Sequence, residues 1–167
     1  MKNLREYIRN VIKESAGRTR RVFDSPEPFG TFRNVRQKSP AFPSKPEGLW
    51  YSCGDSWKEW VEEEMFGADR YQFSYEIEIN SAAMYMISSK EDIEKFHEKY
   101  ITRGKFEKVI DWKAVQDDGY AGIEICPYRS EKRMSPSYFW YYTWDVASGC
   151  IWDKAAILSI REITGEG

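Results

Sequence analysis

The chain has 167 residues, of which 41% are hydrophobic and 31% charged, and its formal net charge is −2. This length and balance predict one soluble globular domain that can bury a sizeable core. The near-neutral charge gives no general attraction to nucleic acid or acidic lipid, and no apolar run reaches the ~20 residues of a membrane span. No secretory signal is predicted either, so the default expectation is a cytoplasmic protein without a membrane partner.

Residues 1–16 are predicted to form a separate amphipathic helix, and residues 17–167 a single α+β domain. Leu4, Ile8 and Val11 fall on one face of this helix, with basic residues elsewhere. Such a helix is typical of a segment that docks on its own domain or on a partner. A basic amphipathic helix also suits a membrane surface, although this one is short.

The end of this helix has a second interpretation. Ile12-Lys13-Glu14 before Ser15 resembles the cleavage site of head-maturation proteases in T4-like phages. In those phages a short N-terminal helix directs internal proteins into the prohead and is then removed. The resemblance implies a mature chain that begins near Ser15 and travels inside a phage virion.

Residues 17–47 are rich in proline and glycine, which predicts loops around short strands. The strand-like piece there is Arg20-Arg21-Val22-Phe23. The interspersed arginines have forked donors suited to phosphate, but such charges are more often simply solvated.

Residues 45–64 predict a strand at 48–52, a turn at Gly54-Asp55 and a helix behind it. Ser56 or Asp55 is expected to cap the helix, with Glu59 closing a capping box on Ser56. The strand would then aim Tyr51 and Ser52 at a helix N-terminus, where backbone donors favour anions such as phosphate. The alternative is a plain strand-helix corner whose apolar stripe only packs, with the stripe made of Trp57, Trp60, Val61 and Met65.

Later elements follow from alternation and helical spacing. Strands are expected at 71–79, 82–87, 120–125, 138–144, 150–152 and 155–163, with a charged loop at 129–136 and a turn at 145–149. A helix is expected to open at Ser88 or Ser89 and to end at Gly104, and one helical turn is expected at 111–115. The order predicts an α+β fold with a mainly antiparallel two-sheet core and flanking helices.

Cys53, Cys126 and Cys150 are odd in number and widely spaced, so a disulfide framework is not expected and a reducing compartment fits better. His97 is the single histidine of the chain, so we expect no metal site and no histidine-dependent triad. It sits next to the apolar stripe of its helix and is expected to be a packing or surface residue.

Several segments resemble motifs of the ADP-ribosyltransferases. Gly48-Leu49-Trp50-Tyr51-Ser52 followed by a helix is similar to the family's second motif, whose strand and helix line the nicotinamide pocket. The alternating strand 75–79, the segment Asp118-Gly119-Tyr120-Ala121-Gly122-Ile123 and the ending Cys150-Ile151-Trp152-Asp153 resemble three further family strands. The resemblance implies a domain that binds NAD and transfers ADP-ribose to a macromolecule of the host.

Two positions depart from the family pattern. Phe23 stands where the first motif often has histidine, so Arg20 or Arg21 would supply an arginine form instead. Ser148 stands where the catalytic glutamate is expected, and the nearest acids are Asp145 and Glu124. The resemblance therefore implies either a divergent enzyme that uses Asp145, with Glu124 as second choice, or an inactive relative.

Cleaving a nicotinamide glycosidic bond passes through an oxocarbenium-like transition state, which a nearby carboxylate stabilises. Aromatic walls must hold the nicotinamide, and a hydroxyl must fix its amide. The candidate cofactor-binding residues are Arg20 and Arg21 for the diphosphate, Ser52 for the hydroxyl, and Trp50, Tyr51 and Tyr85 for the walls, together with Tyr141, Tyr142 and Trp144. Core packing accounts for most of these aromatic residues equally well.

The leading hypothesis is thus an NAD-dependent ADP-ribosyltransferase-like protein without a metal, carried in a phage virion and acting in the host cytoplasm. One alternative is a non-enzymatic internal or interaction protein on the same scaffold. The other is a nucleotide- or nucleic-acid-binding module, in which aromatic rings and arginines stack on bases; the near-neutral charge opposes it.

Overall fold

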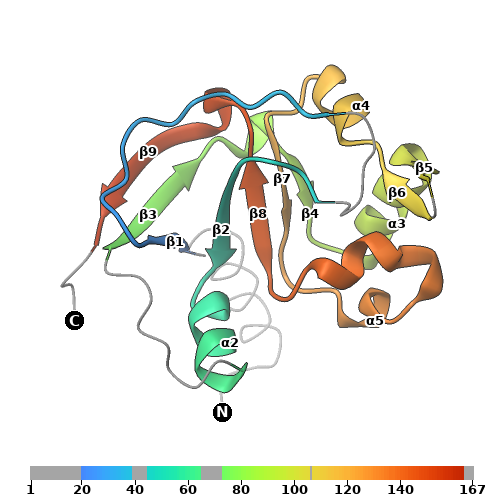
Figure 1. The fold of residues 1–167 in the computed structure, drawn as a ribbon, viewed down its shortest axis with the longest axis horizontal. Coiled ribbons are helices and arrows are strands. Elements are labelled where there is room, and N and C mark those ends of the chain that lie inside the picture. Colours follow the sequence, from blue (N-terminus) through green and yellow to red (C-terminus); the bar gives the residue numbers. More distant parts are fainter. Residues whose placement is uncertain (1–19, 39–44, 65–72, 106, 164–167) are drawn as a thin grey trace, which may run out of the picture.

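The computed structural model describes residues 20–38, 45–64, 73–105 and 107–163. Its centre is a curled sheet of seven strands in the order β4-β7-β8-β2-β1-β3-β9 (Figure 1). Among the strand pairs of the described residues, β4 with β7 is the parallel one and the others are antiparallel. The strands are β1 (Arg21–Ser25), β2 (Leu49–Cys53), β3 (Phe73–Ile79), β4 (Tyr85–Ile87), β7 (Gly122–Ile125), β8 (Ser148–Ile151) and β9 (Ile157–Glu162).

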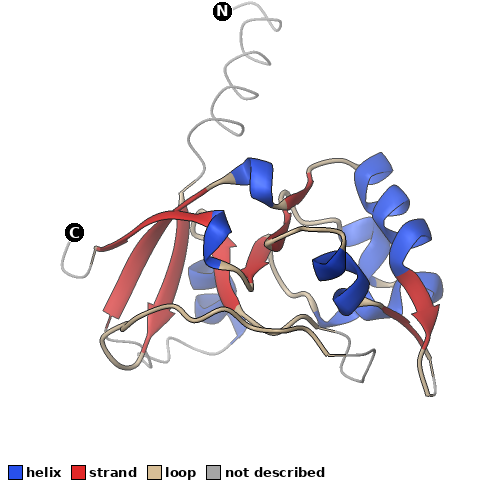
Figure 2. Ribbon diagram, turned by 90° about the horizontal axis from the view of Figure 1, so that it is seen from above, coloured by secondary structure: helices blue, strands red, loops and turns tan. Residues whose placement is uncertain are grey.

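Most helices gather at the β4 end of this sheet, whereas α2 lies beside the end of β2 (Figures 1 and 2). A small antiparallel hairpin of β5 (Ile101–Arg103) and β6 (Lys108–Ile110) stands apart from the sheet. The helices are α2 (Ser56–Glu64), α3 (Lys90–Tyr100), α4 (Trp112–Asp117), α5 (Ser130–Arg133) and the 3₁₀ helices η1 (Ser81–Ala83), η2 (Pro136–Thr143) and η3 (Lys154–Ala156). No helix in the described part of the chain has the length and apolar character needed to cross a membrane.

The start of α3 confirms its predicted cap. The Ser89 hydroxyl accepts a hydrogen bond from the Asp92 backbone N–H at 3.1 Å, and the Asp92 carboxylate accepts the Ser89 N–H at 3.1 Å. This reciprocal capping box satisfies donors that the first turn would otherwise leave unpaired. Ile93, Phe96 and Tyr100 then recur at helical spacing and are buried.

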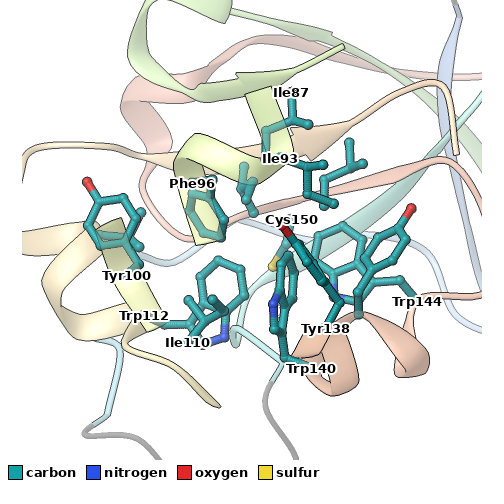
Figure 3. Close-up of a cluster of buried hydrophobic side chains, with 14 of the residues drawn as sticks. Ile87, Ile93, Phe96, Tyr100, Ile110, Trp112, Tyr138, Trp140, Trp144 and Cys150 are labelled. Atoms are coloured by element: carbon teal, nitrogen blue, oxygen red, sulfur yellow. The ribbon is translucent and has the colours of Figure 1, made fainter. Parts of the chain in front are cut away.

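The two faces of the sheet carry separate apolar clusters. One lies under α3, α4 and η2 and contains Phe96, Trp112 and Trp140 with Ile123 and Cys150 (Figure 3). The other lies on the opposite face and is formed by residues of β1, β2, β3 and β8, among them Tyr51, Cys53 and Ile151. Because β2 and β8 contribute to both clusters, the alternation along these two strands decides which side chains share a face.

The loop after β1 runs along one edge of the fold towards α4 (Figure 1). The Val35 N–H donates to the Trp152 carbonyl at 2.8 Å, and the Gln37 N–H donates to the Gln116 side chain at 2.8 Å. The Gln37 side chain in turn exchanges two hydrogen bonds with the Glu47 backbone. These contacts hold the proline-rich segment although it has no regular structure, as the sequence predicts.

The segment predicted as a strand at 138–144 is instead the 3₁₀ helix η2, which begins at Pro136. Phe139 and Tyr142 are exposed and their rings stack with centroids 6.1 Å apart, while Tyr138 and Trp140 are buried. A 3₁₀ helix has three residues per turn, so positions three apart share a side, which a strand does not allow. Because most residues of this segment are aromatic, the three-residue period could not be recognised in the sequence.

Smaller differences concern boundaries and sheets. The predicted charged loop contains α5, the helix expected to end at Gly104 ends at Tyr100, and β9 begins at Ile157 behind η3. The predicted two-sheet core is one continuous curled sheet with the separate β5–β6 hairpin. The helix predicted for residues 1–16 lies outside the described residues.

A disulfide joins Cys53 and Cys126, whose Cα atoms are 6.6 Å apart, so the expectation of unpaired cysteines is wrong for this pair. Ser148 on β8 pairs with Ser52 on one side and with Ile125 on the other. The next residues of β2 and β7 therefore meet beyond the start of β8. The two cysteines are 73 residues apart in the sequence, so local spacing cannot predict that they pair.

Candidate functional site

A cavity of about 310 Å³ opens beside the end of β2, which is within the size range of small-molecule sites. Residues from β1, β2, α2 and the segment before β8 converge on it. Its lining consists of Val22, Phe23, Asp24, Lys45, Trp50, Tyr51, Ser52, Trp57, Trp144, Asp145, Val146 and Ser148.

The strand β2 contributes three of these residues. Trp50 packs against the cluster that contains Trp144, whereas Tyr51 belongs to the cluster on the opposite face. Alternation then places the Ser52 side chain on the Trp50 face. The predicted strand of residues 48–52 thus borders a cavity.

Indole rings form the walls. Trp50 and Trp144 meet edge to face with centroids 4.9 Å apart, and the Lys45 ammonium lies 5.3 Å from the Trp50 ring. Trp57 reaches the cavity from α2 and stacks on Trp60 at 5.0 Å. The buried Nε1 of Trp144 has no hydrogen-bond partner among the described residues. A buried donor without a partner costs free energy, so a ligand acceptor that reached it would be favoured.

Two carboxylates border the same space. Asp145 lies just before β8 and its Oδ1 is 3.5 Å from Nη2 of Arg133, with about a third of each side chain exposed. Such an ion pair is weak, because solvent screens it and the distance is long. Asp24 accepts a hydrogen bond from the Ser74 hydroxyl at 2.5 Å. Asp145 is therefore a carboxylate that a ligand can recruit at little cost.

Two serines of the cavity lining come from the neighbouring strands β2 and β8. Ser52 and Ser148 are direct cross-strand partners, and both are buried. The Ser52 hydroxyl lies 3.3 Å from the Val22 carbonyl and 3.4 Å from the Gly54 carbonyl, and the Ser148 hydroxyl donates to the Val146 carbonyl at 2.9 Å. The long contacts of Ser52 leave its hydroxyl the easier one to redirect to a ligand.

The backbone around Asp145 is held against α2. The Ala147 carbonyl accepts hydrogen bonds from the Cys53 N–H and from the Ser56 hydroxyl, both at 3.0 Å. Ser56 is the first residue of α2, and its hydroxyl is the donor of this contact. The Glu59 N–H bonds to the Asp55 carbonyl at 2.8 Å, which makes Asp55 the residue that precedes the helix.

Glu124 and Arg21 lie elsewhere, on the sheet face opposite to Trp50. The Arg21 guanidinium donates hydrogen bonds to both carboxylate oxygens of Glu124, with Nε 2.6 Å from Oε1 and Nη2 3.1 Å from Oε2. Burial by itself lowers the pKa of Arg21, but the hydrogen bonds to Glu124 and the charge of its carboxylate, together with Tyr51, raise it above the ordinary value. Neither residue is part of the cavity lining, and this ion pair engages both partners.

Four further predicted residues also lie outside the lining. Arg20 is exposed and bonds to Glu76 at 3.1 Å. Tyr85 packs against Phe96 and Tyr120 in the cluster beneath α3. Tyr141 is fully buried in that cluster as well, and Tyr142 is exposed on η2.

The predicted residues whose side chains the structure brings together at one cavity are therefore Trp50, Ser52, Trp144 and Asp145. Tyr51 also borders the cavity, but its ring packs on the opposite face of the sheet, so it does not form the predicted aromatic wall. Sequence reasoning did not select Asp24, Lys45 or Trp57 for the site. Trp57 had a signal, because it begins the apolar stripe of a helix that follows the candidate strand. Lys45 had none, since its role depends on how the chain enters β2.

No protein-family model, curated protein or solved structure matches this chain.

Proposed function

We propose that this chain is an ADP-ribosyltransferase-like protein that binds NAD in the cavity beside β2. The observation that carries this proposal is the convergence of Trp50, Ser52 and Asp145 on one cavity. Trp50 and Ser52 lie on β2, and Asp145 lies before β8, 95 positions after Trp50 in the chain. The motifs predict an aromatic wall, a hydroxyl for the amide and a catalytic acid, respectively. A closed aromatic core beside Ser52 would have favoured a purely structural scaffold.

The nicotinamide ring would lie among the indole walls. Trp50, Trp57 and Trp144 offer flat apolar surfaces, and stacking on an aromatic ring is favourable. The carboxamide needs donors and acceptors, which the Ser52 hydroxyl and the Trp144 N–H supply. Lys45 at the mouth is the basic residue of the lining, so it replaces Arg20 and Arg21 as the candidate for the diphosphate.

Asp145 is the acid best placed for the chemistry. As the glycosidic bond breaks, nicotinamide leaves with the bonding electrons and positive charge develops on the ribose, which a carboxylate stabilises. A nucleophile of a macromolecular acceptor then bonds to the same ribose carbon and loses its proton. Glu124 is less suited, because Arg21 engages it on the other face of the sheet.

One observation favours a second candidate function, a non-enzymatic internal or interaction protein. Ser148 occupies the position expected for the family's glutamate and lines the cavity itself. A cavity with aromatic walls but a weakly held aspartate suits ligand binding without turnover. Under this alternative NAD or a related nucleotide would bind and remain intact.

Delivery inside a phage virion to the host cytoplasm remains part of the proposal. It rests on the resemblance of Ile12-Lys13-Glu14 to a head-protease site, and these residues lie outside the described ranges. Mass spectrometry of the chain from purified particles would test it. A mature N-terminus at Ser15 is expected, and an intact Met1 would refute the processing.

The activity is tested by incubating the full chain with about 1 mM NAD, near the upper end of common KM values, and measuring nicotinamide release. Asp145→Asn should lower the rate about 100-fold, the usual cost of losing one electrostatic contact to a transition state. Glu98→Gln removes an exposed carboxylate from α3 and serves as the matched control. Binding is followed separately by the thermal shift that NAD causes in wild type and in Trp50→Ala.

The outcomes separate the two candidates. Nicotinamide release that depends on Asp145 supports the transferase. A thermal shift that Trp50→Ala abolishes, without nicotinamide release, supports the binding protein. Neither release nor a shift would refute an NAD site in this cavity.

A further inference from the structure

Three potential metal ligands meet on the face of the sheet opposite to the cavity. The sulfur atoms of Cys53 and Cys126 and a carboxylate oxygen of Glu124 all lie within 4.8 Å of one another. Cys53 Sγ is 3.4 Å from Glu124 Oε1. We propose that the reduced chain binds one thiophilic divalent cation such as Zn²⁺ at this Cys53–Glu124–Cys126 cluster, and that the disulfide is the metal-free alternative.

The ligand set suits such a cation. Thiolate sulfur and carboxylate oxygen both bind Zn²⁺, and thiolates select it over hard cations such as Mg²⁺. Glu124 and Cys53 are buried and Cys126 is half-buried, so the site is shielded from water but lies close to solvent on one side. The expectation of no metal site rested on the single histidine and the few soft ligands of the chain, and it did not count a carboxylate as a third ligand.

Charge balance supports the same occupant. Two thiolates and the Glu124 carboxylate carry three negative charges, whereas the Arg21 guanidinium bound to Glu124 carries one positive charge. A divalent cation brings the cluster to neutrality, which is the condition for keeping charges away from water. Arg21 need not be displaced, since a carboxylate has about four lone-pair sites and Arg21 uses two of them. It would orient the ligating carboxylate from outside the metal's own shell.

The backbone already holds the ligands in place. Cys53 ends β2, Glu124 lies within β7, and Cys126 follows β7, so the sheet sets their relative positions. The Cα atoms of the two cysteines are 6.6 Å apart, near the long end of the range for disulfides. Side-chain rotation can therefore separate the sulfur atoms around a cation without moving either strand.

The Tyr51 hydroxyl is a hydrogen-bond donor available to a fourth ligand of the cation. The Tyr51 hydroxyl is buried and has no hydrogen-bond partner among the described residues, although it lies beside Glu124 and Arg21. A water that completes four-coordination at the cation would give this hydroxyl an acceptor.

The two states exchange by ordinary thiol chemistry. Two equivalents of a monothiol reductant supply two electrons and two protons, which convert the disulfide into two thiols, and the reductant leaves as its own disulfide. The cation then binds the two sulfur atoms and releases their two protons. A small-molecule disulfide reverses the exchange: the two thiolates form the Cys53–Cys126 bond, and the oxidant takes up two electrons and two protons to become two monothiols. The cation then loses both sulfur ligands and is released, so occupancy depends on the redox state.

The test uses the full chain, freed of metal with a chelator, in an oxidised and a phosphine-reduced form. Each is titrated with Co²⁺, which reports thiolate ligands through charge-transfer absorption, and then with Zn²⁺ in competition. We expect one cation per reduced chain and none in the oxidised chain. This comparison needs no substitution, so a variant that fails to fold cannot obscure it.

Variants then identify the ligands. The double variant C53S/C126S should abolish the charge-transfer absorption, and Glu124→Gln should weaken binding at least tenfold while keeping that absorption. Cys150→Ala is the control, because Cys150 is a buried free cysteine on the other face of the sheet. The proposal is overturned if the reduced wild type binds no more tightly than C53S/C126S, or if Cys150→Ala removes the absorption instead.

Discussion

Ser148 lies directly across from Ser52 in the β2–β8 ladder, and both border the cavity. The motif resemblance places a glutamate at position 148, so the structure puts the departure from the pattern at the centre of the candidate site. Among the lining residues that the resemblance covers, Trp50 and Ser52 agree with the motif and Ser148 departs from it. Ser148 is therefore the position at which binding and turnover can be separated.

Introducing a carboxylate at position 148 should raise the rate of nicotinamide release. We expect Ser148→Glu to increase nicotinamide release from NAD about tenfold or more, since a carboxylate beside the ribose stabilises the developing positive charge. The cavity next to Ser148 gives the longer side chain space. Ser148→Gln has the same shape without the charge and should not show the increase. Equal rates in both variants would mean that charge at position 148 has no effect.

The buried pair of Arg21 and Glu124 is expected to be critical for stability. Replacing Glu124 takes the opposite charge away from the Arg21 guanidinium, in a region where the Arg21 side chain is 22% exposed and the Glu124 side chain 2% exposed. Glu124→Gln should lower the free energy of unfolding of the oxidised chain by about 3 kcal/mol, measured by urea denaturation.

Glu76→Gln is the matched control for this substitution. It removes the same chemical group from two exposed ion pairs, with Arg20 and Arg161. Its effect should stay below about 1 kcal/mol, because solvent screens these contacts. Equal losses in the two variants would contradict the importance of the buried pair.

His97 should make stability depend on pH on the acid side of neutrality. Its Nδ1 accepts a hydrogen bond from the Trp140 indole at 3.0 Å, which requires the unprotonated nitrogen. Burial and then the charges of Lys108 and Lys132 lower the pKa of His97 below 6.5, although Glu98 opposes this. Stability is therefore complete above about pH 6.5 and falls as the pH drops through the lowered pKa, by at most about 1.4 kcal/mol per pH unit.

His97→Asn provides the comparison, since an amide oxygen can accept the Trp140 bond but does not titrate. Unfolding free energies of both proteins, measured between pH 7 and pH 5, should diverge in slope. Parallel curves would show that His97 is not the responsible group. Asp92 does not interfere, because hydrogen bonds from Ser88 and Ser89 lower its pKa below 3.8.

Gly149 is expected to tolerate no side chain. A Cβ at this position would meet Cζ and Oη of Tyr51 at 2.3 Å. Gly149→Ala should lower the free energy of unfolding by about 2 kcal/mol, because the buried Tyr51 ring would have to be displaced. Gly30→Ala, where a Cβ meets nothing within 4 Å, should be nearly neutral in the same denaturation experiment. A neutral Gly149→Ala would show that Tyr51 can shift.

Local patterns decided the elements whose causes lie within a few residues. The alternation of residues 71–79 predicts the strand that contains β3, and Ser88 or Ser89 is predicted to cap α3, because strand pleating and helix capping act at short range. The strand–helix corner at residues 48–64 was recognisable for the same reason. The aromatic run at 136–143 was not, since rings on every side conceal the period that separates a strand from a 3₁₀ helix.

The sequence by itself also identified Trp50, Ser52 and Asp145 as candidates, because their chemistry and their motif positions are local properties. Tertiary structure alone decided which candidates share a face. The register of β2, β8 and β7 places Ser52 at the cavity and sends Glu124 to Arg21 and the cysteine pair on the other side. A shift of one residue in that register would exchange the two faces, and no local pattern encodes the pairing of β2 with β8, in which the partners Ser52 and Ser148 are 96 positions apart in the chain.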